Sequence, residues 1–234
     1  MTSLNNFLVQ HWTHIPPSRA KKTAEYMLFG DGKHLRPQLV YAFGLTCGLT
    51  SEDCHPIAAA IEALHTYSLI HDDLPAMDDD DFRRGKPSAH RQFDEASAIL
   101  AGDLLQSFSF QLISQYPKLV SAFAQGASAI VTGQSWDIQG DQTLSSIHEA
   151  KTGVLFELCC TLPAQLSHHA IAPAKHIGQS IGIWYQMIDD YHDDEPYKPT
   201  LSELDQHYQN LLQYATHPAL ISFIQQLQTH YVTH

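Results

Sequence analysis

The stretch that organises this chain is residues 57–81, with the sequence IAAAIEALHTYSLIHDDLPAMDDDD. Its first half is almost wholly apolar, which is typical of a buried helix. It then ends in six aspartates within ten residues, Asp72, Asp73 and Asp78–Asp81. A run of aspartates alone is usually a solvated loop. Here it closes a buried helix, where unpaired charges are costly, so we expect a divalent cation or an anion–metal complex among these carboxylates.

The composition of the rest indicates a globular protein. The 234 residues are 44% hydrophobic and 16% charged, which argues against disorder. The formal net charge is −12, from 13 basic and 25 acidic side chains, and the acids gather in two patches. A protein that binds nucleic acid would need the opposite sign of charge, so that class is set aside. The four cysteines have no CxxC spacing and no disulfide framework, and we expect buried thiols.

The N-terminal residues lack the basic start and apolar core of a signal peptide. No run of about eighteen apolar residues is present that could span a bilayer. We therefore expect a cytoplasmic protein without a membrane span.

Almost every periodic segment has the helical repeat, and no Val/Ile/Thr alternation bounded by hairpin turns is found. No linker or repeat divides the chain. The sequence predicts one all-α domain over residues 1–234, a bundle of roughly ten helices around a central cavity, with sites formed between facing helices. The expected helices cover residues 4–12, 18–29, 36–47, a long one from 51 into the first acidic cluster, 94–116, 119–133, 145–166, 174–194, 201–214 and 218–231.

A second acidic cluster follows another apolar helix. On a helix Asp189 and Asp193 are i,i+4 neighbours about 6 Å apart at their Cβ atoms, so they can share one metal assembly. The helix dipole disfavours acidic side chains at a helix C-terminus. Both aspartate clusters lie at the end of an apolar helix, which indicates that they share a ligand. Carboxylates with water suit Mg²⁺ and a substrate phosphate. Basic residues should then hold a polyphosphate from its far side: Lys33, Arg36, Arg83, Arg84 and Lys151.

Six motifs in order resemble those of the short-chain trans-isoprenyl diphosphate synthases, and most closely the bacterial farnesyl diphosphate synthases (geranyltranstransferases). A single DDxxD motif would be weak evidence, whereas six in the family's order are strong. They are Gly32-Lys33-His34-Leu35-Arg36-Pro37, His65 ahead of Asp72-Asp73 and Asp78, Arg83-Arg84-Gly85, Gly133-Gln134 with Asp137, Lys151-Thr152-Gly153, and Gln186 with Asp189-Asp190 and Asp193.

The resemblance implies an all-α Mg²⁺-dependent prenyltransferase that joins isopentenyl diphosphate to dimethylallyl and geranyl diphosphate, giving farnesyl diphosphate (C15) and diphosphate. Metals and cations would stabilise the leaving diphosphate while the alkene attacks the allylic cation and a proton is lost. Three Mg²⁺ ions are implied when substrate is bound, with Mn²⁺ as a substitute, and a homodimer is common in the family.

Residue roles carry over motif by motif. The resemblance implies that Asp72, Asp78 and Asp189 are the principal metal ligands, with Asp73 and Asp193 in support, and that Asp72, Asp78, Lys151 and Asp189 are catalytic. The allylic diphosphate would be held by Arg83, Lys151, Thr152, Gln186 and Lys198, and isopentenyl diphosphate by Lys33, Arg36, His65 and Arg84. Taken singly, His65 is more typical of a core histidine, and Lys33 and Arg36 of a helix start. Gln134 and Asp137 stay open between a structural and a functional role.

Product length is expected to depend on the helix before Asp72. Ser68 lies one turn before Asp72 on the same face, and Tyr67 lies five residues before it, about 7.5 Å along the axis. A rigid aromatic side chain there can form the floor of the pocket for the growing chain. In the family an aromatic at this position accompanies a C15 product and a smaller residue a C20 product.

The sequence departs from the family in two places. The loop after Asp193 is short, and Lys198-Pro199-Thr200 looks like a remnant of a Lys-x-Thr element. His34 replaces a more usual basic residue, which would slightly weaken the isopentenyl diphosphate site. Two alternatives therefore stay open: a C20 synthase, and a catalytically weak or regulatory subunit with a shortened lid. A class I terpene cyclase is disfavoured by the second aspartate motif, and a calcium loop by the absence of its alternating ligands.

Overall fold

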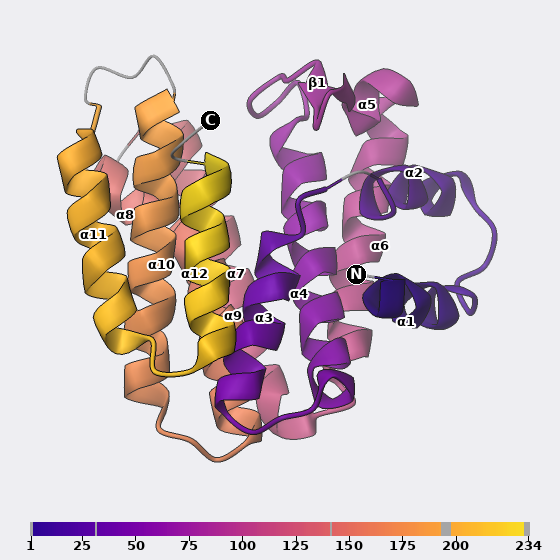
Figure 1. Ribbon diagram of the computed structural model, residues 1–234. Helices are drawn as coiled ribbons and strands as arrows, with labels where there is room; N and C mark the ends of the chain where they lie inside the picture. The colour runs from indigo at the N-terminus through magenta and orange to yellow at the C-terminus, as the bar shows by residue number, and fades with distance from the viewer. Residues whose placement is uncertain (1, 31, 141, 193–197, 232–234) are drawn as a thin grey trace.

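The computed structural model describes residues 2–30, 32–140, 142–192 and 198–231, and over these ranges the chain is almost wholly helical (Figure 1). The all-α prediction is confirmed. The elements are α1 (Thr2–Trp12), α2 (Arg19–Leu28), α3 (Leu35–Thr46), α4 (Ser51–Asp72), β1 (Phe82–Arg83), β2 (Lys86–Pro87), α5 (Ala89–Gln92), α6 (Glu95–Ile113), a 3₁₀ turn (Pro117–Leu119), α7 (Val120–Gln139), α8 (Leu144–His148), a π-helical turn (Glu149–Gly153), α9 (Val154–Leu166), α10 (Ile171–His192), α11 (Leu201–Tyr214) and α12 (Pro218–Tyr231).

Helix α4 is the central element. Its N-terminus is fixed by a capping box, in which Thr50 and Asp53 satisfy each other's backbone N–H groups. Ala58, Ala59 and Ala60 are consecutive and so point in three different directions around the helix, yet all three are fully buried. A helix that is apolar all round belongs in a core, and α4 packs against α3, α6 and α9. The central position of α4 carries the first aspartate motif to one end of the bundle.

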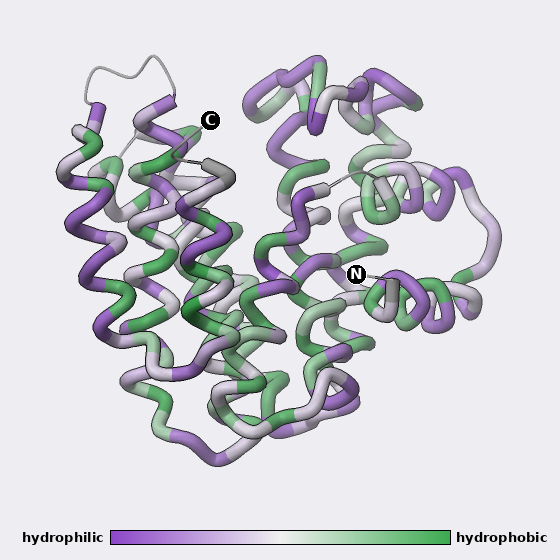
Figure 2. The backbone as a smooth tube through the Cα atoms, viewed as in Figure 1, coloured by the Kyte–Doolittle hydropathy of each residue, from purple (hydrophilic) through white to green (hydrophobic). Residues whose placement is uncertain are grey.

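The second half of the bundle is built on α9 and α10. Gly178 permits close approach of the two helices, because a Cβ atom there would lie 2.7 Å from the backbone of Phe156 and Glu157. The fully buried Trp184 then ties α10 to α11 by donating from Nε1 to the carbonyl of Leu204 at 3.1 Å. Figure 1 shows that the C-terminal end of α10 and the β1–β2 hairpin lie at the same end of the bundle. Hydrophilic residues dominate that hairpin end in Figure 2.

A two-stranded hairpin was not expected from the sequence. Phe82 pairs with Pro87 and Arg83 with Lys86. The two connecting residues, Arg84 and Gly85, have φ of +53° and +72°, as in the two-residue turns that match strand twist. Strands of two residues are too short to show any alternation, which is why the sequence pattern missed them. The hairpin sends Arg83 and Arg84 to different partners.

The single helix predicted over residues 145–166 is wrong in detail. The segment is α8, then the π-helical turn Glu149–Gly153, then α9. The turn lies between two glycines of neighbouring helices, Gly133 of α7 and Gly182 of α10, whose missing side chains make room for its backbone. Wider π turns are frequent at functional sites, and this one carries Lys151 and Thr152.

One helix, α6, is long and apolar enough to cross a membrane by length and composition alone. Half of its apolar window is buried inside the bundle, and α6 packs against α2 and α4. A buried core helix passes the same test, so this finding is weak evidence for a membrane span.

Candidate active site

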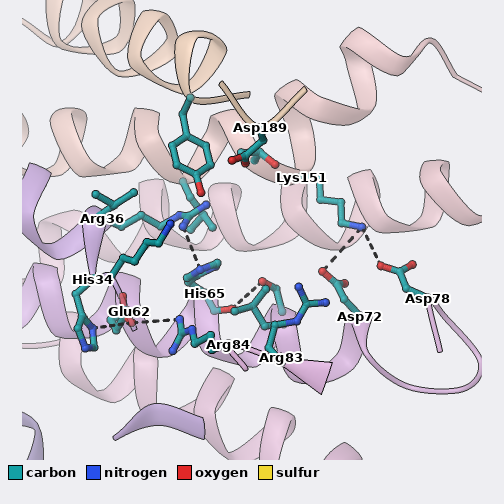
Figure 3. Close-up of a pocket in the computed structure, with 17 residues that line it drawn as sticks. His34, Arg36, Glu62, His65, Asp72, Asp78, Arg83, Arg84, Lys151 and Asp189 are labelled. Atoms are coloured by element: carbon teal, nitrogen blue, oxygen red, sulfur yellow. Dashed lines mark hydrogen bonds and ion pairs between the residues drawn. The ribbon is translucent and has the colours of Figure 1, made fainter. Parts of the chain in front are cut away.

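A cavity of about 660 Å³ opens where α3, α4, the β1–β2 hairpin, the π turn and α10 meet. Its walls divide by charge. Figure 3 shows Asp72, Asp78 and Asp189 toward one end with Lys151, and His34, Arg36 and Arg84 toward the other. Most of the residues predicted for the site therefore come together here: Lys33, Arg36, His65, Ser68, Asp72, Asp78, Arg83, Arg84, Lys151, Thr152 and Asp189.

Lys151 lies among three carboxylates. Its Nζ atom is 2.8 Å from Oδ2 of Asp137, 3.6 Å from Asp78 and 3.9 Å from Asp72. Burial alone would lower the pKa of Lys151, but the hydrogen bond to Asp137 and the charges of Asp72 and Asp78 outweigh it and raise the pKa. The ammonium group thus stays charged. Asp137, left open by the sequence, is the side chain that holds it.

Asp72 is a strongly perturbed acid at this end. Burial raises its pKa to about 6, the nearby carboxylate of Asp78 adds to the shift, and Lys151 opposes it. A further positive charge near Asp72 would stabilise the ionised form of its carboxyl group.

Asp73 faces away from the cavity and holds Arg83. Its side chain is 0% exposed and accepts from Nε of Arg83 at 2.8 Å, while Arg83 also reaches Asp80 at 2.7 Å. Burial raises the pKa of Asp73, although the Arg83 contact opposes that shift. In this arrangement Asp73 orients an arginine at the cavity wall, a role that the sequence prediction of a supporting metal ligand did not include.

The basic end is built around Arg36 and His65. A guanidinium nitrogen of Arg36 lies 3.0 Å from Nε2 of His65, and the guanidinium lies over the ring of Phe156 at 4.9 Å. Burial, reinforced by Arg36, lowers the pKa of His65 well below its usual value, so the ring is neutral and accepts from Arg36. Nε of Arg36 and one terminal nitrogen of Arg84 are buried without a hydrogen-bond partner among the described residues. Both arginines line the cavity and therefore keep unused hydrogen-bonding capacity beside it.

Glu62 is a site residue that the sequence analysis missed. It lies ten residues before Asp72 on α4, and its side chain is 1% exposed. Oε1 is 3.0 Å from Nδ1 of His34 and 3.7 Å from Arg84. A lone glutamate inside an apolar stretch of α4 was the available signal, because a buried carboxylate requires cationic partners.

The two residues expected to determine product length occupy different positions relative to the cavity. Ser68 lines the cavity and donates to the carbonyl of His65 at 2.9 Å. Tyr67 is 8% exposed and packs edge-on against His71, with ring centroids 5.0 Å apart. Tyr67 is not among the residues that line the cavity.

Two predicted contacts lie outside this cavity, and a third predicted residue is not described. Gln186 donates to Asp190 at 2.9 Å and lines a second cavity of about 380 Å³ between α8 and α10. Lys198 is exposed in the segment before α11, and Asp193 lies outside the described residues. The amide of Gln134 is buried, with no partner among the residues that the structure describes.

The acidic end offers the hard oxygen ligands that Mg²⁺ prefers. Within the described ranges, however, no three His, Cys, Asp or Glu side chains converge closely enough to hold an ion by themselves. Asp72 and Asp78 on one side and Asp189 on the other fit an ion whose remaining ligands come from a substrate or water.

The chain is similar to known proteins over most of its length. A family model described as polyprenyl synthetase matches residues 17–198. A farnesyl diphosphate synthase of Haemophilus influenzae is 40% identical over 217 residues, which cover 83% of this chain and 74% of that protein. A geranylgeranyl diphosphate synthase of Rhodobacter capsulatus is 36% identical over 183 residues, covering 72% and 62%. The crystal structure of a geranyltranstransferase from Thermotoga maritima superposes with a TM-score of 0.89 at 27% identity, covering 100% of this chain and 97% of that one. With a match of this length and these identities, the chain belongs to the polyprenyl synthetase family.

Proposed function

We propose that the protein is a Mg²⁺-dependent prenyltransferase that condenses isopentenyl diphosphate with dimethylallyl and geranyl diphosphate to give farnesyl diphosphate and diphosphate. The observation that carries this proposal is the division of one cavity into an acidic end and a basic end. Such a cavity suits two diphosphates, one bound with metal ions and one bound by cations alone.

The allylic diphosphate belongs at the acidic end. Lys151 and Thr152 from the π turn and Arg83 from the hairpin line the cavity beside Asp72, Asp78 and Asp189. Isopentenyl diphosphate belongs at the basic end, where Arg36 and Arg84 keep unsatisfied donors. Lys33 and His65 complete that wall. Gln186 and Lys198 would join the allylic site only after moving from the positions described above.

The metal proposal is three Mg²⁺ ions per site with substrate bound, held by Asp72, Asp78 and Asp189 with Asp193 in support, and Mn²⁺ as a substitute. When bound, Mg²⁺ stabilises the negative charge that develops on the leaving diphosphate. Lys151 and Arg83 donate to the same oxygens as the C–O bond breaks. The alkene of isopentenyl diphosphate then attacks the allylic carbon, and the released proton goes to the departing diphosphate, so no side-chain base is needed.

The proposal of a C15 product is based on side chains of α4, the helix that carries Asp72. Ser68 faces the cavity, and the ring of Tyr67 lies behind the wall one residue earlier. A bulky side chain there limits how far the apolar space can extend along α4.

We further propose that residues 1–234 act as one polyprenyl diphosphate synthase domain and that the protein forms a homodimer. Ile99 and Leu100 on α6 support the second point, since these adjacent apolar side chains are 44% and 57% exposed. The cytoplasmic location stays a prediction from the sequence.

One assay separates the candidate functions. The protein is incubated with Mg²⁺, labelled isopentenyl diphosphate and each allylic primer, and the products are sized. We expect C15 from dimethylallyl and geranyl diphosphate and no elongation in EDTA. A C20 product would favour the geranylgeranyl alternative, and no elongation under any condition would favour a silent or regulatory subunit.

A further inference from the structure

The basic end of the cavity contains one buried carboxylate whose role no motif explains. Glu62 lies on α4 and is almost fully buried, and it contacts both His34 and Arg84. Gly32 leaves room for this arrangement, because a Cβ atom there would lie 2.9 Å from the guanidinium of Arg84. A buried carboxylate between two cavity-lining side chains fixes where each of them points.

The contact with Glu62 decides what the His34 ring can offer the cavity. Nδ1 is 3.0 Å from the Glu62 carboxylate, and a carboxylate only accepts, so Nδ1 carries a proton. Nε2 is then the ring nitrogen left for a group in the cavity that His34 lines. In the neutral ring Nε2 presents a lone pair, which repels a phosphate oxygen. In the charged ring Nε2 donates to it.

The backbone supports a specific requirement for this residue. His34 precedes α3 with φ of +47°, in the left-handed region, where histidine is more common than most side chains. The charged and titratable groups that face it are Glu62 from α4, Arg84 from the hairpin, Lys33 and Arg36 from its own segment, and His65 from α4. Among the described cavity-lining residues of the basic end, Glu62 is the acid in contact with the ring.

Building on the proposed function, we propose that His34 is a further ligand of the isopentenyl diphosphate group, with Glu62 as the residue that positions it. The affinity of the basic end then depends on the charge of His34 and is highest when the ring is protonated. A family member with arginine at this position would have no such dependence, because arginine keeps its charge.

Two substitutions imitate the two states of the ring. His34→Arg gives a permanent cation. His34→Gln gives a neutral side chain whose amide can donate to Glu62 and present an oxygen to the cavity. Neither arginine nor glutamine shares the histidine's tolerance of positive φ, so the two variants carry a similar backbone cost. His14→Gln, at an exposed position away from the cavity, is the control.

Calorimetry measures the Kd of isopentenyl diphosphate for each protein under one set of conditions. We expect His34→Arg to bind about tenfold more tightly than His34→Gln, because the glutamine variant lacks the charged donor. The control His14→Gln should bind like the wild type.

Glu62→Gln tests the positioning role. It keeps an oxygen that can accept from Nδ1 but removes the charge that strengthens this hydrogen bond, so His34 is held less firmly and the Kd of isopentenyl diphosphate should rise. In turnover assays, the KM for isopentenyl diphosphate should follow these changes, whereas the KM for geranyl diphosphate should not.

Equal Kd values for His34→Arg and His34→Gln would overturn the proposal, as would the absence of binding by every variant. Tighter binding by His34→Arg than by His34→Gln, but no product in any assay, would support the subsite and refute the catalytic function instead.

Discussion

Gly133 of α7 is expected to be essential for placing Lys151. A Cβ atom at Gly133 would lie 2.8 Å from the backbone nitrogen of Lys151 and 2.9 Å from Cβ of Ala150. The first distance is 0.6 Å shorter than the 3.4 Å at which ordinary contact begins, and neither atom belongs to a flexible side chain. Gly133→Ala must therefore displace the π turn that carries Lys151.

The stability change should be small. Replacing a helical glycine by alanine gains about 1 kcal/mol of helix propensity, and overpacking costs about 1–3 kcal/mol. The net loss of about 0–2 kcal/mol lowers Tm by about 0–8 °C in a chain of this size. Activity should fall much further, because a displacement of about 1 Å in a positioned group can cost about a hundredfold. The assay is kcat/KM for geranyl diphosphate alongside thermal unfolding.

Gly126→Ala on the same helix is the matched control. There a new Cβ atom would lie 2.5 Å from Cδ1 and 3.1 Å from Cγ of Leu158, so the side chain that must move belongs to α9 and the backbone of the π turn is not touched. Gly126→Ala gains the same helix propensity as Gly133→Ala without a contact with the π turn, so the kcat/KM of this variant should stay near the wild-type value. Full activity in a folded Gly133→Ala protein would refute the argument that this glycine sets the position of Lys151.

Three further predictions concern other parts of the chain. Tyr67→Ala should lengthen the product beyond C15 in the sizing assay, and an unchanged C15 product would contradict the role of this ring as the pocket floor. Asp73→Asn should lower the free energy of unfolding by about 3 kcal/mol in a denaturant titration, because it leaves Arg83 beside a neutral buried partner. The control Asp81→Asn weakens an exposed ion pair with Arg91 and should cost less than about 1 kcal/mol. Equal losses would argue against an anchoring role for Asp73. Asp94→Ala removes the N-cap of α6, whose hydrogen bonds to Ser97 lower the pKa of Asp94. A carboxyl group whose pKa is lower in the folded state stabilises the fold at pH values above its unfolded-state pKa, and this stabilisation is lost as the pH falls through its folded-state pKa. Asp94→Ala should therefore lower Tm by about 2–4 °C at pH 7 and by less near pH 3. An effect that is the same at both pH values would contradict the charge-dependent cap.

The helices could be predicted because their signals are local. Ser18 caps α2 and Asp94 caps α6 as the sequence indicates, by accepting from Lys21 and Ser97. The π turn could not be predicted, because its cause is tertiary. Residues 149–153 have an ordinary helical composition, and they widen where Gly133 and Gly182 allow two helices to approach. The hairpin was hidden for a different reason, since strands of two residues have no period to detect.

The site was predictable where a motif names a residue that faces the cavity, as Asp72, Asp189 and Lys151 do. It was less predictable where a neighbour determines the direction of a side chain. Asp73 follows Asp72 in the motif, yet consecutive residues of a helix point about 100° apart, and Asp73 contacts Arg83 while Asp72 lines the cavity. Glu62 matches none of the quoted motifs and is identified as a site residue only by its contacts.

These contacts explain why a single helix can serve both ends of the cavity. Glu62, His65, Ser68 and Asp72 are three or four residues apart, so they share one face of α4 and follow each other along the cavity wall. Their environments differ in charge, because Glu62 meets His34 and Arg84 while Asp72 meets Lys151 and Asp78. Two diphosphates bound at the ends of this face are held at a separation that the rigid helix fixes. Any shift of α4 along its own axis would therefore change binding at both ends together, as would a shift of the hairpin that carries Arg83 and Arg84. The π turn, which carries Lys151 and Thr152, can adjust the acidic end alone.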